Sequence, residues 1–272
     1  MRPARSLPAT LLGGTALLGL LLGVSGCGDD NADAVAAVRG AGPKSTDAGS
    51  SRLSLASTTR LGTQNVTFQG EGRFDYAADE GLLDLTLGSP GGQGGGTIKE
   101  RIVDGSLYVA LPGRDDAFYK LELAKVAGTS LGSSTDPAAA VAALQGVSGE
   151  VEVVGKEQVR GDETTHYRGQ LDVKKAIDAA PAPVKTQLNA TLGRSGATTV
   201  PFDAYVDDEG RLRRYVQELQ GQAGPQAGGQ KVQTTTTLEF FDFGVPVDVQ
   251  PPPAAQVKDG KPLLDALNRG GR

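Results

Sequence analysis

The sequence has three places where residue type and spacing could support chemistry. Residues 128–132 (GTSLG) match the G-x-S-x-G pattern, in which a serine nucleophile such as Ser130 stands on a sharp turn between a strand and a helix. His166 is the only histidine, and therefore the only imidazole that could act as a general base near neutral pH. Cys27 is the only cysteine, and its thiol could accept a covalent group.

The serine and the histidine are weak candidates for catalysis. Ser130 lies in a loop rich in Gly and Ser that continues to Thr135, whereas a nucleophile elbow needs a strand before it and a helix after it. His166 is expected on the polar face of a strand, together with Arg168 and Gln170, where a histidine is usually just solvated. The sequence therefore assembles no catalytic constellation, and we expect a protein that is not an enzyme.

Cys27 stands at the end of an export signal. Two arginines precede an uncharged apolar stretch over residues 11–24, which has the length of a secretory h-region. A comfortable membrane span would need about 20 residues. Residues 24–27 (VSGC) resemble a bacterial lipobox. In a lipobox, small residues before the cysteine let the signal peptidase approach the peptide bond that it cleaves, and the cysteine thiol accepts a diacylglycerol. We predict a signal peptide over residues 1–26 and anchoring through acylated Cys27 on the outer face of the plasma membrane; the alternative is an ordinary signal peptide.

Composition excludes several classes of protein. One cysteine and one histidine among 272 residues cannot make an internal disulfide, a thiolate zinc site or a polyhistidine cluster. A formal net charge of −5 argues against a general nucleic-acid binder. Residues 207–210 (DDEG) lack the spacing of an EF-hand loop, and the glycines over 88–96 lack the Lys-Ser/Thr of a phosphate loop. We therefore predict no metal site and no cofactor, and we expect a hairpin turn at 207–210.

Alternation of apolar and polar residues dominates from Leu53 to Phe243 and predicts a mainly β, α+β fold. Turn signals at Asp104-Gly105, at 160–162 and at 207–210 separate the apolar runs, so we expect about ten antiparallel strands in hairpin succession.

Two segments carry helical signals instead. Asp136-Pro137 predicts the start of a short helix that ends at Gly146. Residues 174–192 have helical spacing, but two prolines divide them into two short pieces.

The domain boundaries follow from composition. Small polar residues over 27–51 predict a lipid-anchored tether with a short helix near 41–51. The folded domain is expected over residues 52–249. Prolines after Gly244 predict a flexible C-terminal tail over 250–272.

Several segments, taken in order, resemble exported actinobacterial lipoproteins related to the LppX/LprAFG family. They are the lipobox at Cys27, 104–109 (DGSLYV), the helix at 136–146, 164–168 (TTHYR), 206–214 (VDDEGRLRR) and 242–247 (DFGVPV). Each motif is weak alone, and the specificity comes from their order. The resemblance implies a LolA/LolB-like fold, in which short helices cover the concave side of a strongly curved antiparallel half-barrel.

The resemblance also implies a function: binding or carrying acylated lipids or lipoproteins, without catalysis, in a cavity between sheet and helices. The residues expected to line that cavity are Phe68, Phe74, Leu107, Tyr119, Val141, Leu144, Ile177 and Phe202. The helical segments are short, rich in alanine and broken by prolines, which favours a small cavity or none. Two readings stay open: a carrier of acyl lipid or lipoprotein cargo, and a non-enzymatic envelope module, such as a sensor or scaffold, with a filled core and a protein partner.

Overall fold

The computed structural model describes residues 29–88, 94–126, 137–222 and 230–270. Twelve strands in these ranges form one sheet. The strands are β1 (Ser50–Leu61), β2 (Gln64–Asp75), β3 (Glu80–Gly88), β4 (Gly94–Val103), β5 (Ser106–Ala110), β6 (Phe118–Glu122), β7 (Val147–Val159), β8 (Asp162–Asp172), β9 (Thr199–Asp207), β10 (Leu212–Gln222), β11 (Lys231–Phe241) and β12 (Val257–Asp259). The prediction of a mainly β fold with a curved antiparallel sheet is confirmed, with two strands more than expected.

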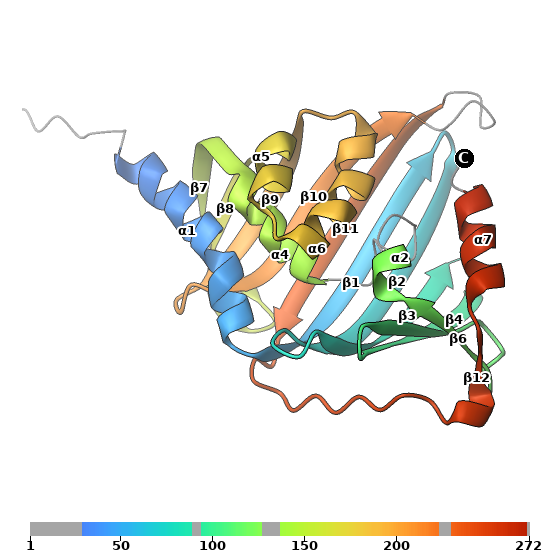
Figure 1. The fold of residues 1–272 in the computed structure, drawn as a ribbon. Helices are drawn as coiled ribbons and strands as arrows, with labels where there is room; N and C mark the ends of the chain where they lie inside the picture. Colours follow the sequence, from blue (N-terminus) through green and yellow to red (C-terminus); the bar gives the residue numbers. More distant parts are fainter. Residues whose placement is uncertain (1–28, 89–93, 127–136, 223–229, 271–272) are drawn as a thin grey trace, which may run out of the picture.

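The sheet consists of two hairpin series joined in the middle. Strands β1 to β6 form one series and β7 to β11 the other, and the two meet where β1 pairs with β11 (Figure 1). Neighbouring strands pair antiparallel except at one edge, where β12 lies parallel to β6. The predicted turns form as expected: Asp104 and Gly105 take φ of 52° and 65° between β4 and β5, and Gly210 takes φ of 79° between β9 and β10.

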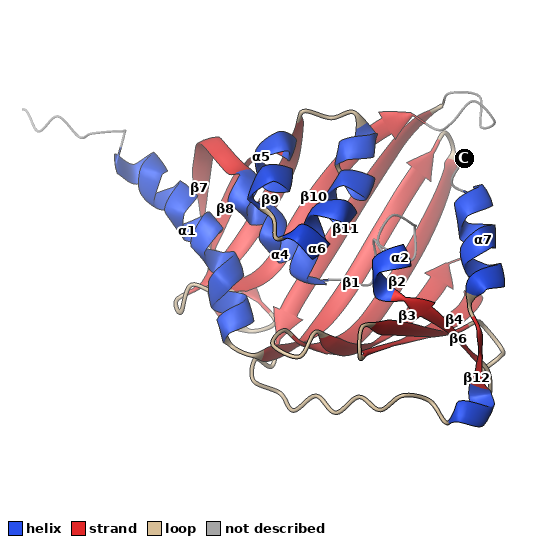
Figure 2. Ribbon diagram, viewed as in Figure 1, coloured by secondary structure: helices blue, strands red, loops and turns tan. Residues whose placement is uncertain are grey.

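Helices cover one face of the sheet, which we call the inner face (Figure 2). Over the β7–β11 half lie α4 (Pro137–Ala143), α5 (Val173–Ala179) and α6 (Ala182–Thr191). Over the other half lie α2 (Leu123–Val126) and α7 (Lys261–Gly270). The predicted helices at 136–146 and 174–192 therefore form. The two groups of helices leave the middle of the inner face, along β1 and β2, between them.

Two glycines on the inner face of β2 accompany the strong curvature of the sheet. A Cβ atom at Gly72 would lie 2.2 Å from the carbonyl oxygen of Leu82, and one at Gly70 would lie 2.5 Å from Cδ2 of Leu85. Since β2 pairs with β3, Gly72 requires the close backbone approach that only glycine allows, whereas at Gly70 the nearest atom is the end of a leucine side chain.

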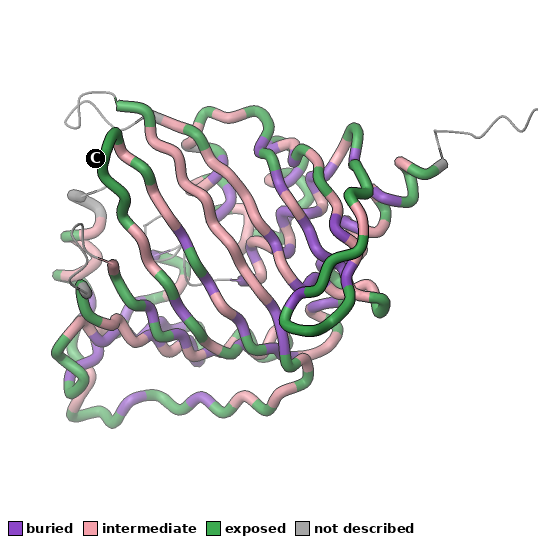
Figure 3. The backbone as a smooth tube through the Cα atoms, turned by 180° about the vertical axis from the view of Figure 1, so that it is seen from behind, coloured by how far each residue is buried: buried purple, intermediate pink, exposed green. Residues whose placement is uncertain are grey.

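Buried residues separate into two cores on the inner face and one on the outer face. The larger inner core joins α1 (Asp29–Asp47), α4, α5 and α6 to strands β7–β11, and the second joins β1–β6 to the leucines of α7. The outer core holds Tyr108, Phe118 and Val249. Along the central strand β1 the outer-face residues Arg52, Ser54, Ala56 and Thr58 are half-buried or exposed, and Figure 3 shows buried and less buried residues alternating along the sheet. The pattern accounts for the alternation in the sequence, because side chains of one strand point to opposite faces.

The predicted N-terminal tether is wrong for most of its length. Residues Asp29–Asp47 form helix α1, whose Val38 and Ala41 are fully buried against the larger core. Asn31 donates from Nδ2 to the carbonyl of Gly149 and accepts from the backbone N–H of Val151. The buried Ser45 hydroxyl accepts from the backbone N–H of Leu212 at 2.8 Å. Packing, rather than local propensity, stabilises this helix despite its two glycines and Pro43.

The predicted flexible tail over 250–272 is also wrong. After β11 the chain crosses to the outer face, where Val249 is buried beside Phe118. It then forms strand β12 and helix α7. Leu263, Leu264 and Leu267 of this helix share one side and pack against the second inner core. The folded domain therefore extends beyond both of the boundaries expected at 52 and 249.

Candidate ligand cavity between sheet and helices

A cavity of about 240 Å³ lies on the inner face between the sheet and the helices α4 and α6. Strands β1, β2, β3, β4, β10 and β11 form its floor. It is lined by Leu53, Leu55, Ser57, Thr59, Phe68, Arg73, Phe74, Gly81, Leu82, Leu83, Ile102, Pro137, Ala139, Ala140, Ala143, Gln187, Leu188, Thr191, Leu192, Gln217, Leu219, Thr234, Thr236 and Leu238. Its volume lies below the roughly 300–1,000 Å³ of pockets for drug-sized ligands.

Alanines on α4 help to keep this space open. Ala139, Ala140 and Ala143 all line the cavity, and each has only a methyl group to extend toward the sheet. The proline at the start of α4 and the break between α5 and α6 keep the helices short. The short, alanine-rich and proline-broken helices predicted a small cavity or none, and the structure has a small cavity.

One end of the cavity is apolar. Leu53 and Leu55 of β1 point to the inner face, with Phe74 of β2 and Leu83 of β3 beside them. Leu238 of β11 stands opposite Leu55 in the strand register. Such a surface binds hydrocarbon, because apolar area leaves water on contact.

The other end is uncharged and carries hydroxyls, with Phe68 of β2 beside Ser57 and Leu219 of β10 beside Thr234. Further along β1 the inner-face residues become Ser57 and Thr59, and on β11 they become Thr236 and Thr234. The Ser57 Oγ lies 3.2 Å from the Thr236 Oγ1, and the Thr59 Oγ1 lies 3.1 Å from the Thr234 Oγ1. We call these four side chains the hydroxyl ladder. Leucine thus gives way to hydroxyl along both strands.

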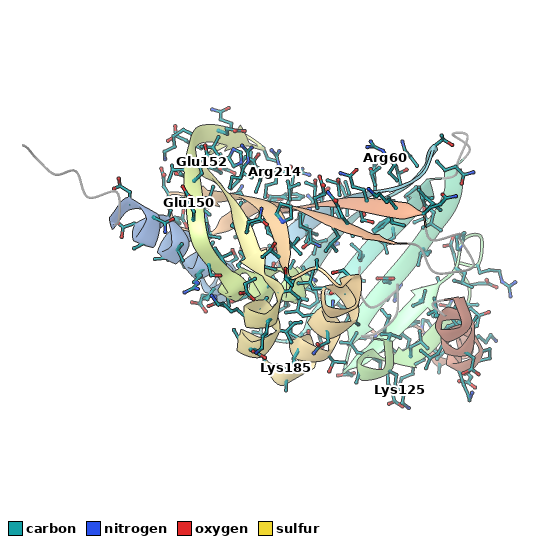
Figure 4. All side chains as sticks on the ribbon, turned by 90° about the horizontal axis from the view of Figure 1, so that it is seen from above. Arg60, Lys125, Glu150, Glu152, Lys185 and Arg214 are labelled. Atoms are coloured by element: carbon teal, nitrogen blue, oxygen red, sulfur yellow. The ribbon has the colours of Figure 1, made fainter. Side chains whose placement is uncertain are left out.

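Charged side chains lie mainly outside the cavity. Of the described residues that line it, Arg73 is the one charged residue, and its side chain is exposed. Arg73 stands between the inner-face residues Gly72 and Phe74, so it points to the outer face. Figure 4 shows the same division: Arg60 and Arg214 lie on the outer side of the sheet, whereas Lys125 of α2 and Lys185 of α6 lie on the helix side.

The eight residues expected to line a cavity divide into two groups. Phe68 and Phe74 do line it. The other six are absent from the described lining. Five of them lie in or against the packed cores instead: Leu107, Val141, Leu144, Ile177 and Phe202. Tyr119 is half-buried on β6. Alternation on a strand assigns the face of a residue, and the gap between facing layers decides whether it meets a neighbour or a void.

The hydroxyl ladder was missed at the sequence level. Residues 234–237 (TTTT) are a visible signal, but a threonine run on a strand places hydroxyls on both faces and indicates no cavity by itself. Ser57 and Thr59 become part of a polar cluster only because strand β11, which is distant in sequence, lies beside β1 in the sheet.

His166 is buried, which contradicts the expected solvated position. Its side chain lies on the outer face, between Glu157 at 2.8 Å from Nδ1 and Asp203 at 2.6 Å from Nε2. The ring stacks on Tyr205 at 4.3 Å between centroids. Asp203 also accepts from Nε of Arg168. This network joins β7, β8 and β9 on the face opposite to the cavity, and its members are engaged with one another rather than with an open site.

The remaining chemical candidates lie outside the described residues or form turns. Ser130 and its motif fall within 127–136, and Cys27 with the signal peptide falls within 1–28, neither of which the structure describes. Residues 207–210 make the β9–β10 turn, where Asp207 accepts from the backbone N–H and the guanidinium of Arg211. In the described ranges, no three His, Cys, Asp or Glu side chains are placed to hold a metal ion. None of the helices described there is long and apolar enough to cross a membrane.

Comparison of the fold with solved structures shows a likeness to Mycobacterium tuberculosis lipoprotein LppX. The two superpose with a TM-score of 0.51 at 13% sequence identity, over 81% of this chain and 100% of LppX. The chain has the fold of LppX. The predicted resemblance is thereby confirmed at the level of the fold, and the cavity lies between the layers of this LppX-like fold.

Two streptomycete proteins are similar in sequence. A 31.2 kDa protein encoded in the rplA–rplJ intergenic region of Streptomyces griseus is 28% identical over 248 residues, covering 79% of this chain and 76% of that protein. A lipoprotein predicted in Streptomyces coelicolor is 31% identical over 115 residues, covering 42% of this chain but 30% of that protein. No protein-family profile matches the chain.

Proposed function

We propose that this protein is an extracytoplasmic lipoprotein, anchored through acylated Cys27, that binds a single acyl chain reversibly and without catalysis in the cavity. The observation that carries the proposal is the cavity of about 240 Å³ with an apolar end between sheet and helices. The LppX-like fold and the similarity to a predicted streptomycete lipoprotein support it. We further propose that the anchor holds the protein at the outer face of the plasma membrane.

The dimensions of the cavity favour one chain over several. Strands rise about 3.3 Å per residue, so the floor from Phe74 and Leu53 to Thr59 extends for roughly 20 Å. The volume is nevertheless small, which indicates a narrow space. A narrow channel with an apolar end suits one extended hydrocarbon chain. Each buried CH₂ group contributes about 0.8 kcal/mol, so a partly buried chain reaches micromolar affinity.

Filling the cavity tests this function. Ala140 lines the cavity from α4, and Ala142 is equally half-buried on the same helix without belonging to the lining. In protein that lacks residues 1–27, Ala140→Phe is expected to weaken the binding of a fluorescent fatty acid about tenfold or more, because the ring occupies the space of the chain. Ala142→Phe should leave binding within about twofold.

Two outcomes count against acyl binding. One is purified protein that carries no lipid by mass spectrometry and binds no fluorescent fatty acid at micromolar concentration. The other is equal loss of binding in both alanine variants, which would point to damage of α4 rather than to filling of the cavity. A cross-linked protein partner without any lipid would favour the sensor or scaffold reading.

A further inference from the structure

We infer that the hydroxyl ladder is a binding site for the head of the lipid, and that this head is uncharged and carries hydroxyl or ester groups. The inference rests on the proposed function and names the class of ligand. The acyl chain then extends from the ladder toward Phe74 and Leu53, the apolar end of the same cavity.

Two rows of polar residues lie on β1 and β11 at the ladder end of the cavity, flanked by Phe68 of β2 in the first row and by Leu219 of β10 in the second. Ser57, Thr236 and Gln217 are paired across β1, β11 and β10, and all three line the cavity. In the next row, Thr59 and Thr234 stand opposite each other. Thr191 of α6 lines the same cavity from the helix layer. The Thr191 hydroxyl donates to the carbonyl of Gln187 within α6, so the hydroxyl donors offered to a polar group here are those of the ladder on the sheet.

The ladder retains hydrogen-bonding capacity after its internal bonds are made. Each hydroxyl has one donor hydrogen and two acceptor lone pairs. The Ser57–Thr236 and Thr59–Thr234 contacts use one donor each, so each pair keeps one donor and several lone pairs. A ligand hydroxyl can both donate to such a pair and accept from it. An ester carbonyl can accept from it.

A charged head does not suit this end of the cavity. Cationic side chains that could neutralise a phosphate or carboxylate are missing from the described lining, apart from the outward-pointing Arg73. The cations Arg160 and Arg214 lie on the outer face instead, where both are paired with Glu239 of β11. An ion moved from water to the ladder would lose hydration without gaining a counter-charge, which costs free energy.

The strand order sets the direction of the ligand. Along β11 the inner-face residues run from Leu238 through Thr236 to Thr234, and along β1 they run from Leu55 through Ser57 to Thr59. Both strands therefore change from apolar to hydroxyl in the same direction. A molecule with an apolar tail and a polar head fits this gradient in one orientation.

Two probes with the same saturated chain separate the head from the tail. Monopalmitoylglycerol has an uncharged head with hydroxyl and ester groups. Palmitate has a carboxylate that is ionised when the pH is well above its pKa. In protein without residues 1–27, monopalmitoylglycerol is expected to displace a fluorescent fatty acid at a concentration at least about tenfold lower than palmitate. Equal displacement by both probes would overturn the assignment of the head.

Threonines on the two faces of β11 provide matched variants. Thr234→Val and Thr236→Val remove ladder hydroxyls at nearly constant volume, and Thr235→Val and Thr237→Val do the same on the outer face. All four threonines are half-buried. Combining the two ladder substitutions is expected to weaken monopalmitoylglycerol binding about tenfold and palmitate binding less than threefold, because only the first ligand loses hydrogen bonds. The outer-face pair should leave both affinities unchanged.

The outcomes distinguish this inference from the proposed function. Lipid binding that is retained, with monopalmitoylglycerol unaffected by the ladder substitutions, would refute the ladder as a head site while leaving acyl binding intact. Failure of both probes in the unsubstituted protein would refute the proposed function itself. Circular dichroism and thermal unfolding of each variant check that its fold is preserved.

Discussion

At the scale of single residues, polar groups on the two faces of the sheet have different roles. On the inner face the hydroxyl ladder meets the cavity. On the outer face, carboxylates are paired with cations, as in the contacts of Glu239 with Arg160 at 2.7 Å and with Arg214 at 2.7 Å. Arg160 also stands 4.0 Å above the ring of Phe241. The outer-face network ties strands β10 and β11 to the β7–β8 turn.

Glu239 gives the network a measurable pH dependence. Partial burial by itself would raise its pKa, but the hydrogen bonds from Arg214 and Arg160 prevail and hold the pKa of Glu239 below the usual 4.5. A carboxylate with a lowered folded-state pKa contributes stability above about pH 4.5, which is lost as the pH falls through its folded-state pKa. Glu239→Gln should therefore lower the free energy of unfolding at neutral pH by about 1 kcal/mol and by less under acid conditions.

Urea unfolding at several pH values measures this effect. Glu218→Gln on β10 is a suitable control, because Glu218 is an outer-face glutamate whose described contact is with the neighbouring Gln220 side chain. A Glu239→Gln variant that loses the same stability at every pH would contradict the assigned ionic role.

At the scale of elements, helix α1 depends on a close approach to α4. A Cβ atom at Gly42 would lie 2.8 Å from the carbonyl oxygen of Val141, whereas one at Gly40 would meet nothing within 4 Å. Gly42→Ala is therefore expected to destabilise the protein by about 1–3 kcal/mol, because the helices must move apart. Gly40→Ala is expected to stabilise it by up to about 1 kcal/mol through helix propensity.

Thermal or denaturant unfolding of the two alanine variants decides between packing and propensity. Opposite signs are the expected result. Stabilisation by both substitutions would mean that α1 is not held against α4 in solution, and would return residues 29–47 to the status of a tether.

At the scale of the whole molecule, the anchor and the folded domain are close in sequence. Helix α1 begins at Asp29, two residues after Cys27, and two extended residues span at most about 7 Å. If Cys27 carries the lipid anchor, as proposed, the domain is held near the bilayer surface. Removal of residues 1–26 takes away two arginines and no acidic residue, which makes the negative net charge larger. Attachment then depends on acyl chains rather than on a basic surface.

Cys27→Ser tests the anchor separately from the cavity. The variant is expected either to appear in the medium or to accumulate as uncleaved precursor, since no thiol remains to accept the diacylglycerol. Membrane fractionation with fatty-acid labelling measures this. The Ala140→Phe variant should stay labelled and membrane-bound, because its substitution affects only the cavity. Labelled, membrane-bound Cys27→Ser protein would refute the lipobox assignment.

Local patterns predicted the strands and turns well, and the ends of the domain poorly. Asp104-Gly105 and residues 207–210 encode turns through backbone preferences that need no distant partner. Gly40, Gly42 and Pro43 disfavour a helix locally, yet α1 forms because Val38 and Ala41 are buried by strands and helices far along the chain. The burial of His166 was not predicted for the same reason: Glu157 of β7 and Asp203 and Tyr205 of β9 enclose its side chain from neighbouring strands.

The sequence alone determined the period-two pattern, the hairpin turns, the short helices and the candidate anchor at Cys27, since each depends on neighbouring residues. Tertiary structure decided that β1 and β11 lie side by side, which brings Ser57 to Thr236 and Thr59 to Thr234. It also decided that Phe68 and Phe74 border a void while Leu107 and Phe202 do not. A cavity is the space left between packed layers, so it depends on distances between residues that no local pattern encodes.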